Sequence, residues 1–275
     1  MIIDKKSVTI GSDPEFFIKN KDSEIVSAIG IVGGTKDEPK PLDKEGYFVQ
    51  EDNVMVEFCI PPSKSSRELI LGINTALLLI EGRLNTQGYH KAVCASAEFD
   101  LETLIQQPKA MEFGCDPDFN AYTGMINNVN ADPFTTLRTA GGHIHIGYDN
   151  HSEPVNLKII KAMDLFLGVP SILMDSDKRR REIYGKAGCF RHKKYGVEYR
   201  VLSNFWIFNS VLIDWVYEQT LRAIDFINNG NLNDSIDFQL ITRAIDTQDV
   251  DLASQLIKQY NLSVVEVGVK TEEYA

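Results

Sequence analysis

GGHIHIG, residues 141–147, places two of the five histidines of this 275-residue chain one residue apart in an apolar stretch. Side chains on a β-strand alternate between its two faces, so His143 and His145 would point to one side and Ile144 and Ile146 to the other. The segment therefore predicts a strand in a sheet with one apolar and one polar face. The two histidines are either a hydrogen-bonded pair in the core or part of a functional site. The polar groups on the neighbouring strands distinguish these two interpretations.

Three further strand-like segments carry polar groups at the same two-residue spacing. Any one of these groups alone is typical of the solvent-facing side of a sheet. Together they would cover one concave face with carboxylates, imidazoles and a guanidinium, which favours a site. The groups are Asp13 and Glu15 in residues 7–20, Glu51, Asn53 and Glu57 in residues 47–60, and Glu198 and Arg200 in residues 196–203.

The rest of the chain predicts an α+β fold with a mostly antiparallel sheet, because strand-like and helix-like segments do not alternate regularly. Residues 61–84 predict a helix that begins with a capping box, Ser65 to Glu68. Without a linker or low-complexity segment, we expect one domain over residues 1–275, with a helical C-terminal part from about 207. Further strands are expected in residues 91–99, 114–123 and 137–148, and further helices in residues 154–174, 205–230, 234–245 and 249–260.

Composition narrows the class of protein. The net charge of −11 argues against general binding to nucleic acid. The longest strongly apolar run, ALLLI at 76–80, is too short to cross a bilayer, and the N-terminal residues lack the apolar core of a signal peptide. The four cysteines form no CxxC pair and indicate neither a zinc site nor a disulfide framework. We expect a reduced protein of the cytoplasm.

A basic segment, residues 178–200, stands out in this acidic chain, with five arginines and four lysines. It is either a solvated loop or a phosphate clamp, since guanidinium groups match phosphate geometry and glycines let the backbone fold over a nucleotide. Carboxylates with an imidazole suit Mg²⁺ or Mn²⁺, and several unscreened carboxylates would repel one another without an ion. Metal-bearing carboxylates that face arginines are typical of phosphoryl transfer.

Five motifs in chain order resemble the phage and bacterial carboxylate–amine ligases called amidoligase type 2, within the glutamine synthetase superfamily. The motifs are GSDPEFF, QEDNVMVEF, GCDPDFNAY, AGGHIHIG and GVEYRVLSNFW, over roughly residues 10–210. The resemblance implies a curved antiparallel sheet, a partial barrel of the glutamine synthetase catalytic-domain type, with helices packed outside. The small N-terminal domain of glutamine synthetase has no counterpart here, so its ammonium site and ring assembly are not implied.

The resemblance also implies roles for individual residues. His145 would lie nearer the substrate, and Arg191 and Arg200 would contact phosphate during catalysis. Asp116 and Asp118, in the second GxDP turn, either hold or deprotonate the incoming amine or simply cap that turn. The implied metal ligands are Asp13, Glu15, Glu57, His143 and Glu198, with Glu51 or Asp52 as an open addition. The implied nucleotide contacts are Asn53, Arg180, Arg181, Arg191 and Arg200. Arg180 and Arg181 belong to a run of three arginines, 179–181, that compete for one phosphate contact.

The implied reaction is ATP-dependent amide formation through an acyl phosphate, with Mg²⁺ or Mn²⁺. A small-molecule or peptide carboxylate and an amine would be the substrates, with an amidotransferase or a second ligase as a partner protein. A phage-encoded chain would act in the host cytoplasm, with no nucleic acid or membrane as partner. Two alternatives stay open: a cupin-like metal enzyme that uses HxH with a glutamate, and a non-catalytic protein that keeps the ligase fold to bind a nucleotide or peptide.

Overall fold

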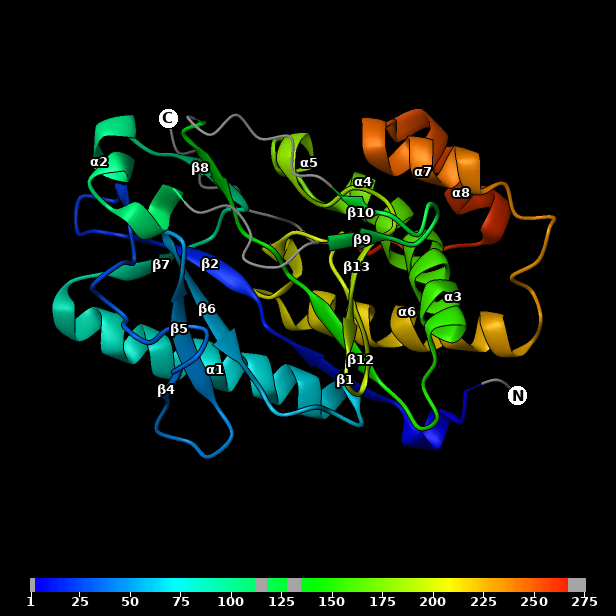
Figure 1. Ribbon diagram of the computed structural model, residues 1–275, viewed down its shortest axis with the longest axis horizontal. Helices are drawn as coiled ribbons and strands as arrows, with labels where there is room; N and C mark the ends of the chain where they lie inside the picture. Colours follow the sequence, from blue (N-terminus) through cyan, green and yellow to red (C-terminus); the bar gives the residue numbers. More distant parts are fainter. Residues whose placement is uncertain (1–2, 112–117, 128–134, 267–275) are drawn as a thin grey trace.

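The computed structural model describes residues 3–111, 118–127 and 135–266 and contains two six-stranded sheets and a strand pair (Figure 1). All strand pairs are antiparallel. The first sheet consists, in order, of β1 (Thr9–Ser12), β12 (Ile144–Gly147), β14 (Gly196–Tyr199), β13 (Cys189–Lys193), β9 (Asp118–Asn120) and β10 (Ile126–Asn127). The second consists of β3 (Ile25–Val26), β2 (Glu15–Lys19), β6 (Met55–Cys59), β5 (Phe48–Asp52) and β4 (Lys40–Pro41), with β7 (His90–Ala92) paired to β2. The separate pair is β8 (Ser96–Glu98) with β11 (Leu137–Thr139).

The two sheets meet at Pro14, which interrupts the chain between β1 and β2. Proline has no N–H to donate to a ladder, so it is suited to a strand end. The Pro14 carbonyl accepts from the Phe58 N–H at 3.2 Å, and the Glu15 N–H donates to the Gly141 carbonyl at 2.9 Å. The first bond joins Pro14 to β6, and the second joins β2 to the glycine pair that precedes β12. The polar faces of the two sheets therefore converge at this junction.

The helices cover the outer faces of the sheets. In Figure 1, α1 lies along the second sheet, and α3 and α6 lie beside the first. The helices are α1 (Ser66–Gln87), α2 (Leu101–Ile105), α3 (Glu153–Met163), α4 (Val169–Met174), α5 (Arg180–Ile183), α6 (Ser210–Asn228), α7 (Phe238–Thr247) and α8 (Val250–Tyr260). The predicted α+β fold, with curved antiparallel sheets and external helices, is confirmed.

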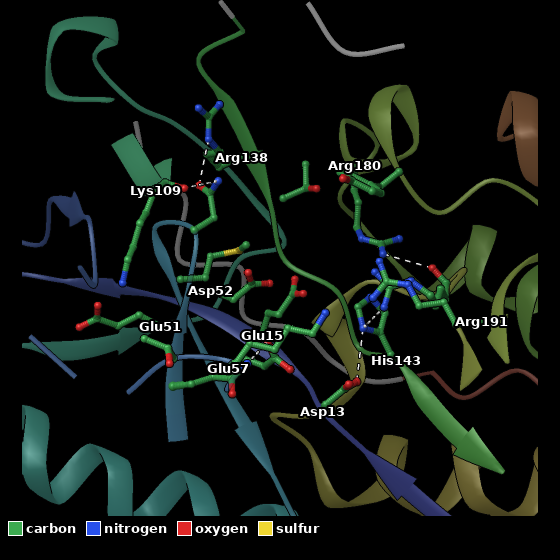
Figure 2. Close-up of a pocket in the computed structure, with 18 of the residues that line it drawn as sticks. Asp13, Glu15, Glu51, Asp52, Glu57, Lys109, Arg138, His143, Arg180 and Arg191 are labelled. Atoms are coloured by element: carbon green, nitrogen blue, oxygen red, sulfur yellow. Dashed lines mark hydrogen bonds and ion pairs between the residues drawn. The ribbon is translucent and has the colours of Figure 1, made fainter. Parts of the chain in front are cut away.

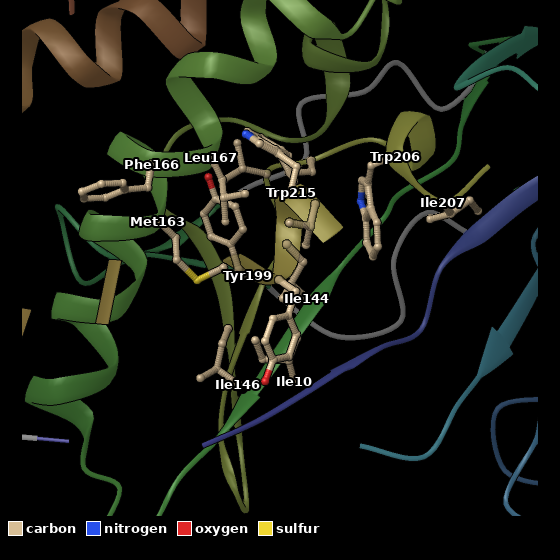
Figure 3. Packing of buried hydrophobic residues seen from close by; sticks show 14 of the residues in the cluster. Ile10, Ile144, Ile146, Met163, Phe166, Leu167, Tyr199, Trp206, Ile207 and Trp215 are labelled. Carbon is tan, nitrogen blue, oxygen red and sulfur yellow. The ribbon is translucent and has the colours of Figure 1, made fainter. Parts of the chain in front are cut away.

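Alternation along β12 separates the core from the site as the sequence predicted. Ile144 and Ile146 are fully buried and, with Ile10 and Tyr199 from the adjacent strands, face the helices (Figure 3). His145 pairs with Gly11 on one side and Glu198 on the other, and therefore lies on the opposite face. Helix α1 also begins at the predicted capping box. The Ser65 hydroxyl accepts from the N–H of Glu68 at 3.2 Å.

The expected single strand over residues 47–60 is instead a hairpin of β5 and β6. Asn53 turns the chain with φ of 54°, a left-handed conformation that asparagine tolerates better than most residues. Pairing across the hairpin then sets the faces: Gln50 lies opposite Glu57, and Asp52 opposite Met55. Asp52, rather than Glu51, therefore shares the face of Glu57.

Other expected elements also differ from the structure. Residues 137–148, expected as one strand, form parts of β11 and β12, which belong to different sheets. Residues 91–99 form parts of two strands, β7 and β8, and the helix expected over 154–174 contains a π-helical turn at Asp164–Gly168. The basic segment, expected as a loop, forms α5 and β13, because β13 pairs with β14 over Phe190 to Lys193. C-terminal helices are present as predicted, although the long one begins at Ser210 after a short 3-10 turn, Asn204–Trp206. Within the residues described, none of the helices combines the length and apolar character needed to cross a membrane.

The π-helical turn places a carboxylate in the core. Asp164 is fully buried and accepts hydrogen bonds from Tyr122 Oη at 2.9 Å, Tyr199 Oη at 2.8 Å and the Gly188 N–H at 2.7 Å. Burial nevertheless raises its pKa to about 7. The network links α3 to β14 and to the residues before β13, which carry much of the site described below.

We expect the stability of the protein to fall as pH rises through the titration range of Asp164. The folded chain keeps this proton up to about pH 7, whereas the unfolded chain loses it near 3.8, so ionisation costs folding free energy between these values and the effect levels off above them. Urea unfolding from about pH 5 to pH 8 should show this slope in the wild type and a reduced slope in Asp164→Asn. Equal slopes in the two proteins would contradict the assignment.

Candidate active site

A cavity of about 460 Å³ lies at the junction of the two sheets. Figure 2 shows its carboxylates between arginines on one side and Lys109 and Arg138 on the other. The acidic lining residues are Asp13, Glu15, Asp37, Glu51, Asp52 and Glu57, and the basic ones are Lys36, Lys109, Arg138, His143, Arg180, Arg191, Lys193 and Arg200.

One group of side chains that could hold a metal ion comes from β12, β14 and the residue after β1. Asp13, His145 and Glu198 each offer a ligand atom, and these atoms all lie within 4.8 Å of one another. His145 Nε2 is 3.0 Å from Asp13 Oδ1, and Glu198 stands directly opposite His145 in the ladder. We call these three residues the histidine triad.

A second group comes from the second sheet and contains only carboxylates. Glu15, Asp52 and Glu57 also offer ligand atoms within 4.8 Å of one another, and Glu15 stands opposite Glu57 in the ladder. The Gln50 amide donates to Glu57 Oε2 at 2.9 Å, which orients that carboxylate. We call Glu15, Asp52 and Glu57 the carboxylate triad. Glu51 lines the cavity, but its Oε1 accepts from the N–H groups of Gly30 and Gly33.

Burial and mutual repulsion disfavour the charged forms of Glu15 and Glu57 in the carboxylate triad. Burial and the charge of Asp52 raise the pKa of Glu15 to about 8. Burial and the charges of Asp13, Asp52 and Glu15 raise the pKa of Glu57 well above its ordinary value. A divalent cation would relieve both the repulsion and the loss of hydration, and all-oxygen ligand sets suit Mg²⁺ or Mn²⁺.

The histidine triad has the opposite electrostatic character. Burial raises the pKa of Asp13, but the neighbouring His145 and His143 outweigh it and hold that pKa well below its usual range. Burial and Asp13 raise the pKa of Glu198, but Arg200 and the histidines bring it down to about 2. Asp13 Oδ1, His145 Nε2 and Glu198 Oε2 are buried and make ion-pair contacts, but no hydrogen bond of acceptable geometry within the described residues. Such atoms fit a metal ion.

Two of the predicted phosphate arginines meet at one aspartate. Asp118 Oδ1 lies 2.8 Å from Arg200 Nε and 3.0 Å from Arg191 Nε. Arg200 Nη1 also contacts Glu198 Oε1 and lies 3.0 Å from His143 Nδ1. Asp118 thus holds the two guanidinium groups side by side along the cavity wall. Asp116, the other predicted amine contact, lies outside the described residues.

The three arginines at 179–181 point in different directions. Arg180 lines the cavity and donates to the carbonyls of Val201 and Arg200. Arg181 donates to Ser171 Oγ at 2.7 Å and is absent from the described cavity lining, while Arg179 contacts Glu98 at the surface. Of these three, Arg180 is the one that the structure brings to the site.

The two histidines differ in their surroundings. His145 belongs to the histidine triad, although the resemblance assigns the metal to His143. The His143 side chain is buried against Arg200, and burial together with the positive charge of Arg200 lowers its pKa to about 4. Asp13 Oδ1 contacts both rings, at 3.3 Å from His143 Nδ1 and 3.0 Å from His145 Nε2. Both histidines face Asp13, in agreement with the predicted shared face, and the geometry groups His145 with carboxylates that could hold a metal ion.

The paired glycines before the histidines are required by close packing. A Cβ at Gly141 would overlap the His143 ring, and a Cβ at Gly142 would lie 2.5 Å from the Ser203 carbonyl oxygen. The Gly141 N–H also donates to Glu15 Oε2 at 2.6 Å. Glycine therefore lets the polypeptide pass between the two triads.

Sequence reasoning left some site residues unassigned and placed others differently. Lys193 Nζ lies 2.6 Å from Glu198 Oε2, and its two-residue spacing from Arg191 could have indicated a shared face. The choice between Glu51 and Asp52, and the role of Gln50, could not be settled without the hairpin at Asn53. The Asn53 side chain donates to the Ala110 carbonyl and accepts from Arg138 Nε at 3.1 Å, at the edge of the cavity.

Comparison with known protein families supports the motif-based interpretation. A family model described as phage phiEco32-like COOH.NH2 ligase-type 2 matches residues 125–221, which include His143, Arg191, Glu198 and Arg200. A comparison with curated proteins gives no match. Residues 125–221 of this chain thus carry the sequence pattern of the carboxylate–amine ligase family that the motifs predicted.

Proposed function

We propose that this protein is an ATP-dependent carboxylate–amine ligase that forms an amide through an acyl phosphate. The family match supports the joining of a carboxylate to an amine. The observation that carries the finer proposal is a cavity lined by the carboxylate triad, by Asp13 of the histidine triad, and by Arg191 and Arg200. Arg200 also contacts Glu198, a second member of the histidine triad. Phosphoryl transfer needs this combination of divalent cations and guanidinium groups.

The proposed reaction has two steps. A substrate carboxylate oxygen attacks the γ-phosphorus of ATP, and the bond to ADP breaks. The amine nitrogen then attacks the acyl carbon, inorganic phosphate leaves, and the nitrogen loses a proton. Binding both substrates in one cavity would supply orientation and limit hydrolysis of the acyl phosphate.

The residues of the cavity have distinct proposed roles. Arg191 and Arg200 would bind the transferred phosphoryl group, and Asp118 would keep their guanidinium groups close together. Arg180 would add positive charge near the same phosphates. The two triads would hold Mg²⁺ or Mn²⁺, which screens phosphate charge when bound. Lys193 neutralises Glu198 when no other cation is present.

The two alternative functions have less support from this geometry. A cupin-like enzyme needs one metal site, whereas the carboxylate triad offers a second set of ligands about the same cavity. A binding protein without catalysis has no need for five buried or half-buried carboxylates and a histidine grouped in two triads. The carboxylate triad therefore favours the ligase.

Calorimetry tests the nucleotide and metal dependence without knowledge of the substrates. A non-hydrolysable ATP analogue should bind in the presence of Mg²⁺ and lose at least about tenfold in affinity when the metal is chelated, because phosphate would then face unscreened carboxylates. Binding of equal strength with and without metal would contradict the proposal.

The acyl phosphate can be tested with hydroxylamine in place of the unknown amine. Incubation with ATP, Mg²⁺ and a panel of carboxylic acids should give a hydroxamate together with an equal amount of phosphate. If every acid that stimulates phosphate release fails to give a hydroxamate, the protein hydrolyses ATP and does not form an acyl phosphate.

A further inference from the structure

We propose that Tyr195 is a positioning residue that fixes the ring of His145 for metal binding. The inference rests on the proposed function, because it concerns the metal in the histidine triad. Neither the sequence motifs nor the family match assigns a role to Tyr195.

The contact between the two side chains is direct. Tyr195 Oη lies 2.8 Å from His145 Nδ1, while the other ring nitrogen, Nε2, lies 3.0 Å from Asp13 Oδ1. The two rings also lie against each other, with centroids 6.0 Å apart and planes inclined by 32°. The imidazole is therefore held at one end by a carboxylate of the triad and at the other by a phenol.

This arrangement determines which nitrogen is available to a metal. A neutral imidazole carries its proton on one nitrogen and a lone pair on the other, and the hydrogen bond at one nitrogen selects the state of the other. If Nδ1–H donates to Tyr195 Oη, the lone pair of Nε2 points toward Asp13 and Glu198. A metal-ligating histidine commonly has such an outer partner, whose loss weakens metal binding.

The position of Tyr195 is set by the sheet. Tyr195 lies in the turn between β13 and β14, and its carbonyl accepts from the Tyr148 N–H at 3.1 Å. The next residue, Gly196, has φ of 151° and stands opposite Gly147 in the ladder. A Cβ at Gly196 would overlap the Ile146 carbonyl, so only glycine lets this turn approach β12 so closely. The fold thus brings the phenol to His145 by backbone pairing.

Exposure argues against a purely structural role for this tyrosine. Tyr195 is 43% exposed, whereas His145 is largely enclosed. The phenol therefore contributes less to the core than a buried aromatic would, and its hydroxyl is the part that contacts the site. Removing that hydroxyl should change metal binding more than stability.

The experiment compares Mn²⁺ binding to the wild type, Tyr195→Phe and a matched control, Tyr89→Phe, by calorimetry. Tyr89 follows α1 and does not line the described cavity. We expect Tyr195→Phe to weaken binding at one of the Mn²⁺ sites about 10- to 100-fold, and Tyr89→Phe to bind as the wild type does. Circular dichroism and thermal unfolding without metal should show both variants folded.

A double-mutant cycle connects the effect to His145. In a His145→Gln background, Tyr195→Phe should have little further effect on Mn²⁺ affinity, because the interaction it removes is already absent. Additive effects of the two substitutions would overturn the inference, and so would Mn²⁺ affinity in Tyr195→Phe equal to that of the wild type. If the wild type binds no divalent metal at all, the proposed function fails and the inference fails with it. If the wild type binds metal and Tyr195→Phe binds it equally well, the inference alone fails.

A measurement on the unaltered protein provides a second test, should Tyr195→Phe fail to fold. Long-range ¹H–¹⁵N NMR spectra of the Mg²⁺-loaded wild type should show the proton of His145 on Nδ1. Protonation on Nε2 in that state would overturn the inference.

Discussion

Glu198→Gln should lower amide formation by about 10³-fold or more and weaken the Mg²⁺-dependent part of nucleotide binding. Glu198 is fully buried and belongs to the histidine triad, and it contacts both Lys193 and Arg200. Glutamine keeps the size of the side chain but removes the negative charge that a cation requires. Calorimetry with the ATP analogue and Mg²⁺, together with the hydroxamate assay, measures both effects.

Glu98→Gln is the matched control for this substitution. Glu98 is an exposed residue of β8 that contacts Arg179 at 3.3 Å, and it does not line the described cavity. Its replacement should leave nucleotide binding and turnover close to those of the wild type. If Glu198→Gln unfolds, or keeps the full Mg²⁺ dependence of the wild type, Glu198 is a structural residue and the histidine triad is not a metal site.

Arg200→Met should destabilise the fold by about 3–5 kcal/mol as well as remove activity. Arg200 Nε pairs with Asp118 at 2.8 Å, and Nη1 contacts Glu198. The negative charges around Arg200 raise its pKa further above the ordinary arginine value despite burial. Methionine would leave two buried carboxylates without their shared cation, which costs more than the loss of an exposed ion pair. Urea unfolding measures the change.

Two further variants make this result interpretable. Arg200→Lys keeps the charge but cannot reach both carboxylates with a rigid fork, so its stability should lie between that of the wild type and that of Arg200→Met. Arg83→Met removes an exposed pair with Asp43, 3.2 Å apart, and should cost less than about 1 kcal/mol. A loss below about 1 kcal/mol in Arg200→Met would show that Lys193 and Arg191 compensate for the missing charge.

The parts of the site that lie on regular strands could be predicted from the sequence. The alternation in GGHIHIG and in the segment around Glu198 follows directly from strand geometry, and the structure keeps both patterns. The same holds for α1, whose first turn depends on the local spacing of Ser65 and Glu68. Such features need no knowledge of what the segment packs against.

Features that depend on pairing between segments could not be predicted. A left-handed Asn53 reverses the chain inside an apparently continuous strand, and this reversal brings Asp52 to the cavity. The basic segment forms a strand because β14 is available as a partner, although its charges are typical of a loop. Asp118 likewise contacts Arg191 and Arg200, which lie far from it in the sequence, so these contacts depend on the tertiary fold.

The hairpin of β13 and β14 makes the site sensitive to insertions and deletions. Ten consecutive residues, 191–200, supply Arg191, Lys193, Tyr195, Glu198 and Arg200. Because strand side chains alternate, one residue added within either strand would turn the groups beyond it toward the helices. Length variation in natural or engineered variants should therefore be confined to loops elsewhere in the chain, and this hairpin would have to be exchanged between proteins as a whole.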